Sequence, residues 1–305
     1  MSAVARPEIS RARAWILAAR PATLPAAVVP VVVGAAAALS DGAPFRGIVF
    51  AMTLICAVLI QIGTNFANDY SDFARGADTE ARLGPVRVTQ SGLMDQTSVK
   101  RGIIVAFGLA VLIGAYLAYV GGWPIIAIGV LSVLSGLAYT GGPYPLGYHG
   151  LGDIFVFVFF GVIAVTGTAY LQSGHWSVLP LLLSIPIGLF VTNILVVNNL
   201  RDLPTDLAAG KRTLATRIGD GATRAQYAVS TVAAYVIPLV IGVTDPARRL
   251  IMLPLISLPL ALRRVLVVAK GASGRDLNLM LKRTGQLLLL FGGLLAVGAA
   301  LSRPR

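Results

Sequence analysis

Two short clusters of aspartate and asparagine carry the residue types that bind a divalent cation. Within each cluster an asparagine precedes an aspartate by four residues, so on a helix their side-chain oxygens share one face. Carboxylate and amide oxygens are ligands that Mg²⁺ prefers. Because two acidic clusters that face each other repel unless a cation lies between them, we expect a magnesium site. The predicted ligands are Asn68, Asp69, Asp72, Asn198, Asp202 and Asp206.

Arginine and lysine residues are interleaved with these acids. Acidic and basic side chains around one cavity suit a polyanion bound through a metal ion, and diphosphate is the obvious candidate. Any one of these charges could instead be an ordinary solvated residue at a membrane surface. The recurrence of the Asn-x-x-x-Asp pattern 130 residues later makes that explanation weak for the pair of clusters. The residues predicted to contact diphosphate are Arg75, Arg82, Arg87, Arg201 and Lys211.

A segment rich in glycine and proline, 139–153, places three tyrosines near the clusters and contains no Lys or Arg. The face of an aromatic ring can stabilise a carbocation that forms when diphosphate leaves, and Tyr139 is the candidate for this role. Each tyrosine could equally be an anchor at the membrane surface. His149 is expected to make a structural or substrate hydrogen bond. With two histidines and one cysteine, the chain is not expected to form a zinc site or a Ser/His/Asp triad.

The elements that carry these residues are predicted to be membrane helices. Hydrophobic residues make up 56% of the 305-residue chain and charged residues 12%, which is far below the charged share of a typical soluble domain. A soluble protein with buried helices is a weak alternative, because apolar runs of roughly 20 residues, enough to cross the hydrocarbon core, recur along the chain. Long runs without alternation indicate helices rather than barrel strands. The nine predicted spans are 21–40, 47–68, 102–121, 123–141, 152–172, 178–199, 224–243, 249–269 and 284–301.

The segments outside these spans also carry predictions. The first span follows several arginines as a signal peptide would, but it is long and contains three prolines, so we interpret it as a retained helix. Residues 9–20 are predicted to form an amphipathic lead-in at the membrane surface. Two loops, 69–101 and 200–223, are too long to remain structureless without a purpose, and their glycines and prolines indicate folded lids. No domain boundary is visible, so 1–305 is taken as one domain.

The distribution of Lys and Arg predicts the orientation in the membrane. Of the 25 such residues, 20 fall at the N-terminus and in the loops after the second, sixth and eighth spans, and 5 fall on the other side. The side rich in positive charge is expected in the cytoplasm. An odd number of spans keeps the Lys/Arg-rich connections on that side and the Lys/Arg-poor ones on the other. The N-terminus and both acidic clusters are therefore expected in the cytoplasm, and the C-terminus outside. This orientation also explains the net charge of +12, so nucleic acid is not an expected partner.

The two clusters resemble the paired aspartate-rich motifs of the UbiA superfamily of intramembrane prenyltransferases. Within that superfamily, further stretches are similar to the MenA group, the 1,4-dihydroxy-2-naphthoate polyprenyltransferases. Examples are Ala19-Arg-Pro-Ala-Thr-Leu-Pro-Ala-Ala27 and Gly210-Lys-x-Thr-Leu-Ala-x-Arg217. The other similar stretches are Asn68-Asp-Tyr-Ser-Asp72 with Arg75-Gly-Ala-Asp78 and Gly84-Pro-x-Arg87, Tyr139-Thr-x-Gly-Pro-x-Pro-Leu146, and Asn199-x-Arg-Asp-x-x-x-Asp206. The resemblance covers roughly residues 15–220, and the last three spans match only in hydropathy.

The resemblance implies an all-α integral membrane protein, a bundle of nine transmembrane helices with cytoplasmic lid loops, in the cell membrane of a bacterium. It implies Mg²⁺-dependent transfer of a polyprenyl chain from polyprenyl diphosphate to 1,4-dihydroxy-2-naphthoate. Carbon dioxide and a proton are lost, and the product is demethylmenaquinone, a precursor of menaquinone. The prenyl tail would lie in membrane lipid or in an apolar groove. The implied catalytic residues are Asp72, Asp202, Lys211 and Tyr139, and the implied acceptor-binding residues are Arg20, Asn65, Tyr70, Tyr144 and His149.

One departure from the superfamily concerns the acceptor. Many members that act on aromatic acids have basic residues after the fourth span, whereas 140–150 contains none, so Arg20 or Lys211 is expected to take the carboxylate. Two alternatives remain. The chain could be another member that acts on 4-hydroxybenzoate, homogentisate, a haem precursor or a lipid-linked sugar precursor, or it could be a cation-coupled transporter. Transporters place their charges near the bilayer midplane, so charges at helix ends favour the enzyme.

Overall fold

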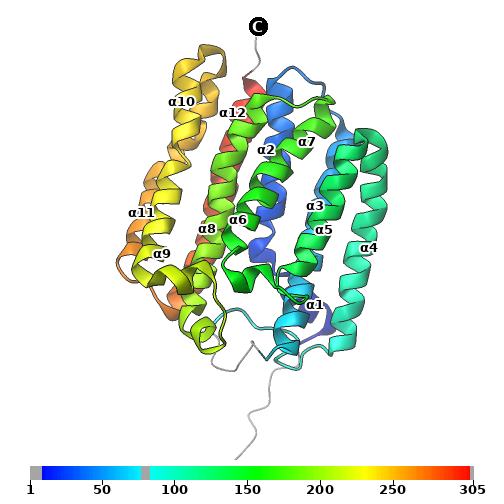
Figure 1. The fold of residues 1–305 in the computed structure, drawn as a ribbon. Coiled ribbons are helices and arrows are strands. Elements are labelled where there is room, and N and C mark those ends of the chain that lie inside the picture. Colours follow the sequence, from blue (N-terminus) through cyan, green and yellow to red (C-terminus); the bar gives the residue numbers. More distant parts are fainter. Residues whose placement is uncertain (1–8, 77–82, 303–305) are drawn as a thin grey trace, which may run out of the picture.

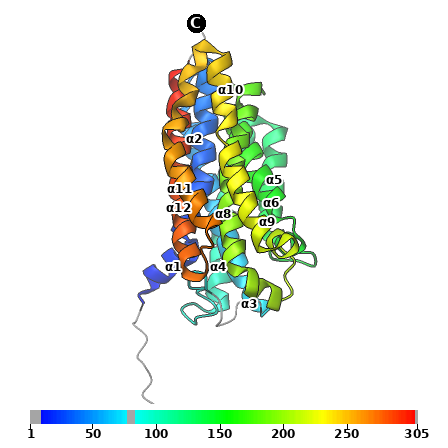
Figure 2. The ribbon, with the colours of Figure 1, turned by 90° about the vertical axis from the view of Figure 1, so that its left-hand side faces the viewer.

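The structure is a computed structural model that describes residues 9–76 and 83–302, and the secondary structure of this described part is helical. The long helices run side by side in one elongated bundle (Figures 1 and 2). The elements are α1 (Arg11–Ala19), η1 (Pro21–Thr23), α2 (Pro25–Ser40), α3 (Gly47–Ala74), α4 (Gln96–Gly121), α5 (Trp123–Ala138), η2 (Leu146–His149), α6 (Gly152–Val156), η3 (Phe157–Ile163), α7 (Ala164–Ser173), α8 (Val178–Ala208), α9 (Leu214–Ala233), α10 (Val236–Thr244), η4 (Pro246–Ser257), α11 (Leu258–Ala269) and α12 (Gly274–Leu301).

Each of the nine predicted spans falls on a helical segment. In the described chain, 7 segments are long and apolar enough to cross a membrane, and an eighth is a bent pair, α1–η1 with α2, whose two parts meet at 52°. The remaining segment, α5, is shorter, so the number of nine crossings stays a prediction. Large apolar side chains such as Ile48, Leu112 and Ile256 are about 70% exposed, as expected where a helix contacts lipid rather than water. The chain is an integral membrane protein.

The two ends of the bundle differ. The connections after α3, α5, α8 and α11 lie at the same end as α1, and the C-terminal end of α12 lies at the opposite end (Figure 1). Helices α3 and α8 continue past the predicted ends of their spans, to Ala74 and Ala208. Both acidic clusters are therefore helical. The predicted long loop 200–223 is wrong, because only 209–213 connects α8 to α9.

One half of the bundle is solidly packed. Helix α8 is its centre and is covered by α2, α9 and α12. The rings of Phe190 and Phe291 lie 4.6 Å apart, and Tyr235 packs edge-on against Phe291 at 5.1 Å. Such aromatic pairs add to the stability that burial of apolar surface provides. The half of the bundle built from α3 to α7 leaves an internal space instead, and this space contains the candidate site.

The boundary between the two halves depends on a close approach of two backbones. A Cβ atom at Gly161 would lie 2.6 Å from the Cα atom of Gly188, so η3 can approach α8 this closely only because residue 161 is glycine. Element η3 is a π-helical turn, a feature often found at functional sites. It places Phe159 and Phe160 in the wall of the internal space.

Candidate active site

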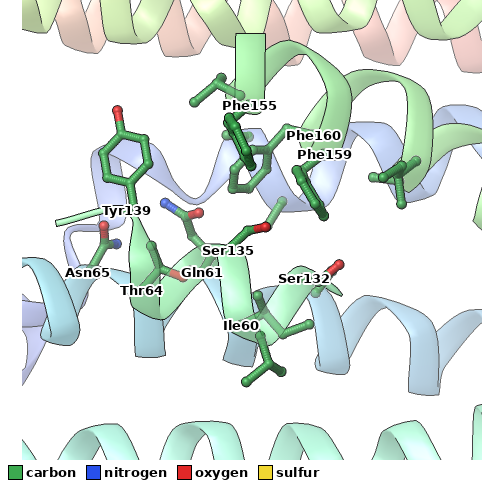
Figure 3. Close-up of a pocket in the computed structure, with 18 of the residues that line it drawn as sticks. Ile60, Gln61, Thr64, Asn65, Ser132, Ser135, Tyr139, Phe155, Phe159 and Phe160 are labelled. Atoms are coloured by element: carbon green, nitrogen blue, oxygen red, sulfur yellow. The ribbon is translucent and has the colours of Figure 1, made fainter. Parts of the chain in front are cut away.

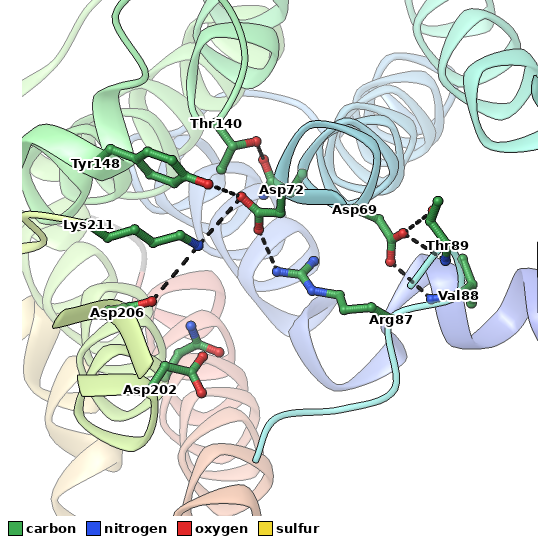
Figure 4. A network of polar contacts seen from close by, with 12 residues as sticks. Asp69, Asp72, Arg87, Val88, Thr89, Thr140, Tyr148, Asp202, Asp206 and Lys211 are labelled. Atoms are coloured by element: carbon green, nitrogen blue, oxygen red, sulfur yellow. Dashed lines mark hydrogen bonds and ion pairs between the residues drawn. The ribbon is translucent and has the colours of Figure 1, made fainter. Parts of the chain in front are cut away.

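Asp72, near the end of α3, is the centre of a polar network at one end of the bundle (Figure 4). The Tyr148 hydroxyl donates a hydrogen bond of 2.6 Å to Asp72 Oδ1. The Arg87 guanidinium lies 2.8 Å from Asp72 Oδ2, and Lys211 Nζ lies 3.6 Å from Oδ1. The Asp72 side chain is only 3% exposed, so its negative charge is held by these three groups rather than by bulk solvent.

Lys211 connects the two acidic clusters. Its ammonium nitrogen lies 3.6 Å from Asp72 of the first cluster and 3.9 Å from Asp206 of the second. It also lies 4.6 Å from the centre of the Tyr148 ring, a cation–π distance. Two backbone hydrogen bonds fix the loop around it, from Lys211 N to the Asp206 carbonyl and from Arg212 N to the Tyr148 carbonyl. The two clusters therefore meet around one cavity, as their matched spacing predicted, and the Lys211 ammonium lies between them.

In the second cluster, Arg201 holds the acids in place. Its guanidinium donates two hydrogen bonds to Asp202, at 2.8 and 2.6 Å, and one of 2.8 Å to Asn198 Oδ1. A further bond of 2.9 Å reaches Asn278 on α12. The Arg201 side chain has 0% exposure and does not line the cavity. Arg201 is therefore not positioned for the predicted contact with diphosphate; it fixes Asn198 and Asp202, two residues that do line the cavity.

Asp69, which was predicted to bind the metal ion, holds a neighbouring loop in this structure. Its carboxylate accepts hydrogen bonds from the backbone nitrogens of Val88 and Thr89, at 3.2 and 3.1 Å, and from the Thr89 hydroxyl. It is not among the residues that line the cavity. Asp69 anchors the loop that carries Arg87, and Asp72 receives the Arg87 guanidinium. The two Asp69 oxygens hold this loop and the residue does not line the cavity, so its role as a metal ligand stays a prediction that the geometry does not support.

Thr140 and Tyr148 complete the network around the first cluster. The Thr140 hydroxyl donates a 2.8 Å hydrogen bond to Asn68 Oδ1, which orients the amide. Tyr139, at the end of α5, lines the cavity. The segment after it is folded back by a 2.8 Å bond from Gly147 N to the Tyr139 carbonyl, and this fold brings Tyr148 to Asp72. Thr140 was not predicted as a site residue, and Tyr148 was noted only as one of three tyrosines near the clusters, not as a hydrogen-bond partner of Asp72.

The predicted acceptor-binding residues separate into two groups. Arg20 and Asn65 line the cavity. Tyr70 does not line it and packs instead against a small apolar cluster around Phe66. Tyr144 and His149 also lie away from the cavity lining: their rings stack 3.7 Å apart, and Tyr144 is 57% exposed. These last three positions do not support contact with an acceptor inside the cavity.

Of the residues predicted to bind diphosphate, Arg87 and Lys211 line the cavity. Arg75 lies outside the lining, where its guanidinium contacts the Gly142 carbonyl and lies 5.7 Å from the Tyr148 ring. Arg82, together with Asp78 of the motif, falls outside the residues that the structure describes. The roles of Arg75 and Arg82 stay predictions.

The network closes one end of a cavity of about 830 Å³. Away from the charged end the lining is mainly apolar and comes from α2 to α5, η3, α7 and α8. Figure 3 shows part of this lining, from α3, α5 and the segment around η3. Several lining residues, among them Val111, Ile126 and Val130, are more than half exposed, so the cavity is not closed off by side chains along α4 and α5. The cavity therefore combines a polar head, an apolar channel and a side that opens toward lipid. This shape suits a long apolar molecule with a charged head.

The comparisons with known proteins agree with this geometry. The profile of the UbiA prenyltransferase family matches residues 27–290. The chain belongs to the UbiA prenyltransferase family. It is 40% identical over 290 residues to a 1,4-dihydroxy-2-naphthoate octaprenyltransferase of Mycobacterium tuberculosis, an alignment that covers 94% of this chain and 96% of that protein. A protein of the same name from Escherichia coli is 36% identical, with 97% and 98% covered.

The fold is also that of solved UbiA proteins. A UbiA homologue from Archaeoglobus fulgidus, bound to GPP and Mg²⁺, superposes with a TM-score of 0.67 at 14% sequence identity. The superposition covers 94% of this chain and 99% of that one. At this identity the likeness shows the arrangement of helices and no more.

The donor set of this UbiA protein fits Mg²⁺. The oxygens of Asn68, Asp72, Asn198, Asp202 and Asp206 are hard ligands, and all five residues line the charged end of the cavity. Within the described residues no three His, Cys, Asp or Glu side chains are grouped closely enough to hold a metal ion by themselves. This is compatible with Mg²⁺, which keeps several waters and is commonly bound by one or two carboxylates together with substrate phosphates.

Proposed function

We propose that this protein transfers a polyprenyl chain from polyprenyl diphosphate to 1,4-dihydroxy-2-naphthoate, with decarboxylation, and so produces demethylmenaquinone in its reduced, quinol form. The observation that carries the proposal is the position of Lys211, between Asp72 and Asp206, at the charged end of a long apolar cavity. The names of the relatives supply the identity of the acceptor. The whole chain, 1–305, would act as one prenyltransferase domain.

The charged end of the cavity would bind the diphosphate. Asn68, Asp72, Asn198, Asp202 and Asp206 would hold Mg²⁺, which when bound neutralises charge on the diphosphate and favours its departure. Lys211 and Arg87 line the same end and would bind the phosphate oxygens directly. Because both already pair with Asp72, binding would exchange carboxylate contacts for phosphate contacts.

The apolar channel would hold the prenyl tail and protect the reacting carbon from water. The bond between the first prenyl carbon and the diphosphate oxygen breaks, and the positive charge is spread over the allyl group. Tyr139 and Phe155 place aromatic rings beside this part of the cavity, where a ring face favours a cation. An electron-rich ring carbon of the naphthoate then forms the new bond to the allyl carbon, the carboxylate leaves as carbon dioxide, and the product is the neutral quinol.

Orientation follows the distribution of charge. The N-terminus and the charged end of the cavity would face the cytoplasm of a bacterial cell membrane, where water-soluble 1,4-dihydroxy-2-naphthoate is available. The C-terminus would lie outside. The prenyl diphosphate would enter from the lipid side, and the product would leave the same way.

The test is an assay of the purified protein with Mg²⁺, one polyprenyl diphosphate and a panel of aromatic acceptors. We expect a prenylated, decarboxylated product from 1,4-dihydroxy-2-naphthoate and no product when EDTA replaces Mg²⁺. The matched acceptors are 4-hydroxybenzoate and homogentisate. Product from 4-hydroxybenzoate alone would overturn the assignment of the acceptor, and no transfer to any member of the panel would overturn the assignment as an aromatic prenyltransferase.

A further inference from the structure

Gln61 on α3 presents a buried amide oxygen that has no hydrogen-bond partner among the described residues. The residue is 7% exposed and lines the cavity two helical turns before Asn68 (Figure 3). Buried polar groups are almost always paired, because an unpaired one costs stability. An unpaired acceptor in the wall of a substrate cavity therefore indicates a partner that arrives with the substrate.

The orientation of this amide is fixed by its neighbours. The Thr23 hydroxyl donates to the Arg20 carbonyl at 3.0 Å, so its oxygen is left to accept hydrogen bonds. It accepts one from Gln61 Nε2 and one from Asn65 Nδ2, both at 3.2 Å. If the Gln61 amide were reversed, its oxygen would face a hydroxyl oxygen whose proton is already used. The Gln61 oxygen is therefore held away from Thr23.

The space around Gln61 suits a flat aromatic molecule. Tyr139 and Phe155 line this part of the cavity, together with Ser135 of α5 (Figure 3). Arg20 lines the cavity too. Its backbone lies in the left-handed region, at φ 52° and ψ 70°, and among the described non-glycine residues no other has a positive φ. Because such a conformation is costly and the Thr23 bonds maintain it, the placement of Arg20 is part of the same arrangement.

We propose that Gln61 positions the aromatic acceptor by accepting a hydrogen bond from its 4-hydroxyl group. The inference rests on the proposed function. In 1,4-dihydroxy-2-naphthoate the 1-hydroxyl is adjacent to the carboxylate and is tied to it by an internal hydrogen bond, so the 4-hydroxyl is the donor that remains available. A carboxylate held by a cation such as Arg20 and a hydroxyl held by Gln61 would fix the ring in one orientation. Gln61 does not take part in the chemical step.

The first test is Gln61→Leu, which removes the amide and nearly keeps the volume. We expect the KM for 1,4-dihydroxy-2-naphthoate to rise about five- to tenfold, the change expected for one neutral hydrogen bond. The KM for polyprenyl diphosphate should stay unchanged, which also shows that the variant is folded. The matched control is Thr166→Val, outside the cavity lining, because the Thr166 hydroxyl already bonds the Val162 carbonyl one turn earlier at 2.6 Å. The control should leave both KM values unchanged.

Two acceptor analogues identify the group that Gln61 binds. Inhibition by 4-hydroxy-2-naphthoate, which keeps the 4-hydroxyl, should weaken in Gln61→Leu as the substrate does. 1-Hydroxy-2-naphthoate lacks the 4-hydroxyl, so it should inhibit the wild-type protein and Gln61→Leu equally. Equal loss with both analogues, or equal changes in the KM of both substrates, would overturn the inference. These outcomes presuppose a wild-type enzyme that prenylates 1,4-dihydroxy-2-naphthoate, so failure of the proposed function is recognised separately by the absence of product from wild-type protein.

Discussion

Asp72 is the residue on which three segments of the chain converge. The segments after α3, α5 and α8 each bring one group to its carboxylate: Arg87, Tyr148 and Lys211. A buried carboxylate of this kind is stable only while its partners remain. Binding of a metal-bound diphosphate at Asp72 would therefore change the contacts of all three segments at once.

The first prediction concerns Asp72 itself. Asp72→Asn keeps the size of the side chain but removes its charge, so activity should fall roughly 100- to 1,000-fold, the usual effect of deleting a group that acts on transition-state charge. Prenyl transfer by purified protein at saturating Mg²⁺ is the measurement. The control is Asp95→Asn, because Asp95 is exposed and only caps α4 through Ser98 N. Activity within threefold of wild type in Asp72→Asn would contradict the assigned site.

The second prediction compares two tyrosines of one loop. Tyr148→Phe removes the hydroxyl that holds Asp72 at 2.6 Å, and we expect activity at limiting Mg²⁺ to fall about tenfold, as for other groups that orient a metal ligand. Tyr144→Phe should have no effect, because its phenol is exposed and lies outside the cavity lining. A titration of activity with Mg²⁺ measures both. Equal titration curves for the two variants would show that the Tyr148 hydroxyl does not support Asp72.

For single residues, the sequence predicted which side chains share a helix face but not their partners, because partners depend on tertiary packing. The four-residue spacing correctly predicted that Asn68 and Asp72 share a face, because helical periodicity is local. The partners of Asp69 and Arg201 depend on where a loop and a neighbouring helix pack, through Thr89 and Asn278. Spacing along one helix carries no information about those contacts. Types and positions of charges were therefore predictable, but their partners were not.

At the scale of elements, the position of η3 decides the shape of the cavity. Its aromatic residues reach the lining because Gly161 lets the π-helical turn lie directly against Gly188. Hydropathy predicted this span as a helix, since its composition is apolar throughout. It could not predict the π-helical turn or the contact. The hydropathy pattern also placed the ends of α3 and α8 too early, because polar residues interrupt an apolar run without ending the helix.

The third prediction tests this contact. Gly161→Ala places a methyl group 2.6 Å from a backbone atom that no rotamer change can move, so we expect a loss of roughly 1–3 kcal/mol in the free energy of unfolding. Gly293→Ala is the matched control, because a Cβ atom there meets nothing within 4 Å. The measurement is the Tm of each protein in detergent. A lower Tm for Gly161→Ala alone is expected, and equal Tm values would contradict the close approach.

At the scale of the whole molecule, the two halves of the bundle differ: one is solidly packed, and the other contains the cavity. The half around α8 is filled by side chains, whereas the half from α3 to α7 encloses the cavity and shares some lining residues with the outer surface. Under the proposed function, the prenyl tail would enter from the membrane while the diphosphate stays at the polar end. This arrangement requires the charged end to face a compartment that supplies both Mg²⁺ and a water-soluble acceptor, and the excess of Lys and Arg at that end predicts the cytoplasm.

The fourth prediction tests this orientation with reporter cysteines. In a Cys56→Ser background, His175→Cys places an exposed thiol between α7 and α8, and Lys270→Cys places one after α11, at the opposite end of the bundle. A membrane-impermeant thiol reagent added to intact cells should label position 175 and not position 270, and after lysis it should label both. Because both variants lack Cys56, labelling reports only the new thiol. Labelling of position 270 alone in intact cells would reverse the orientation and place the site outside the cytoplasm.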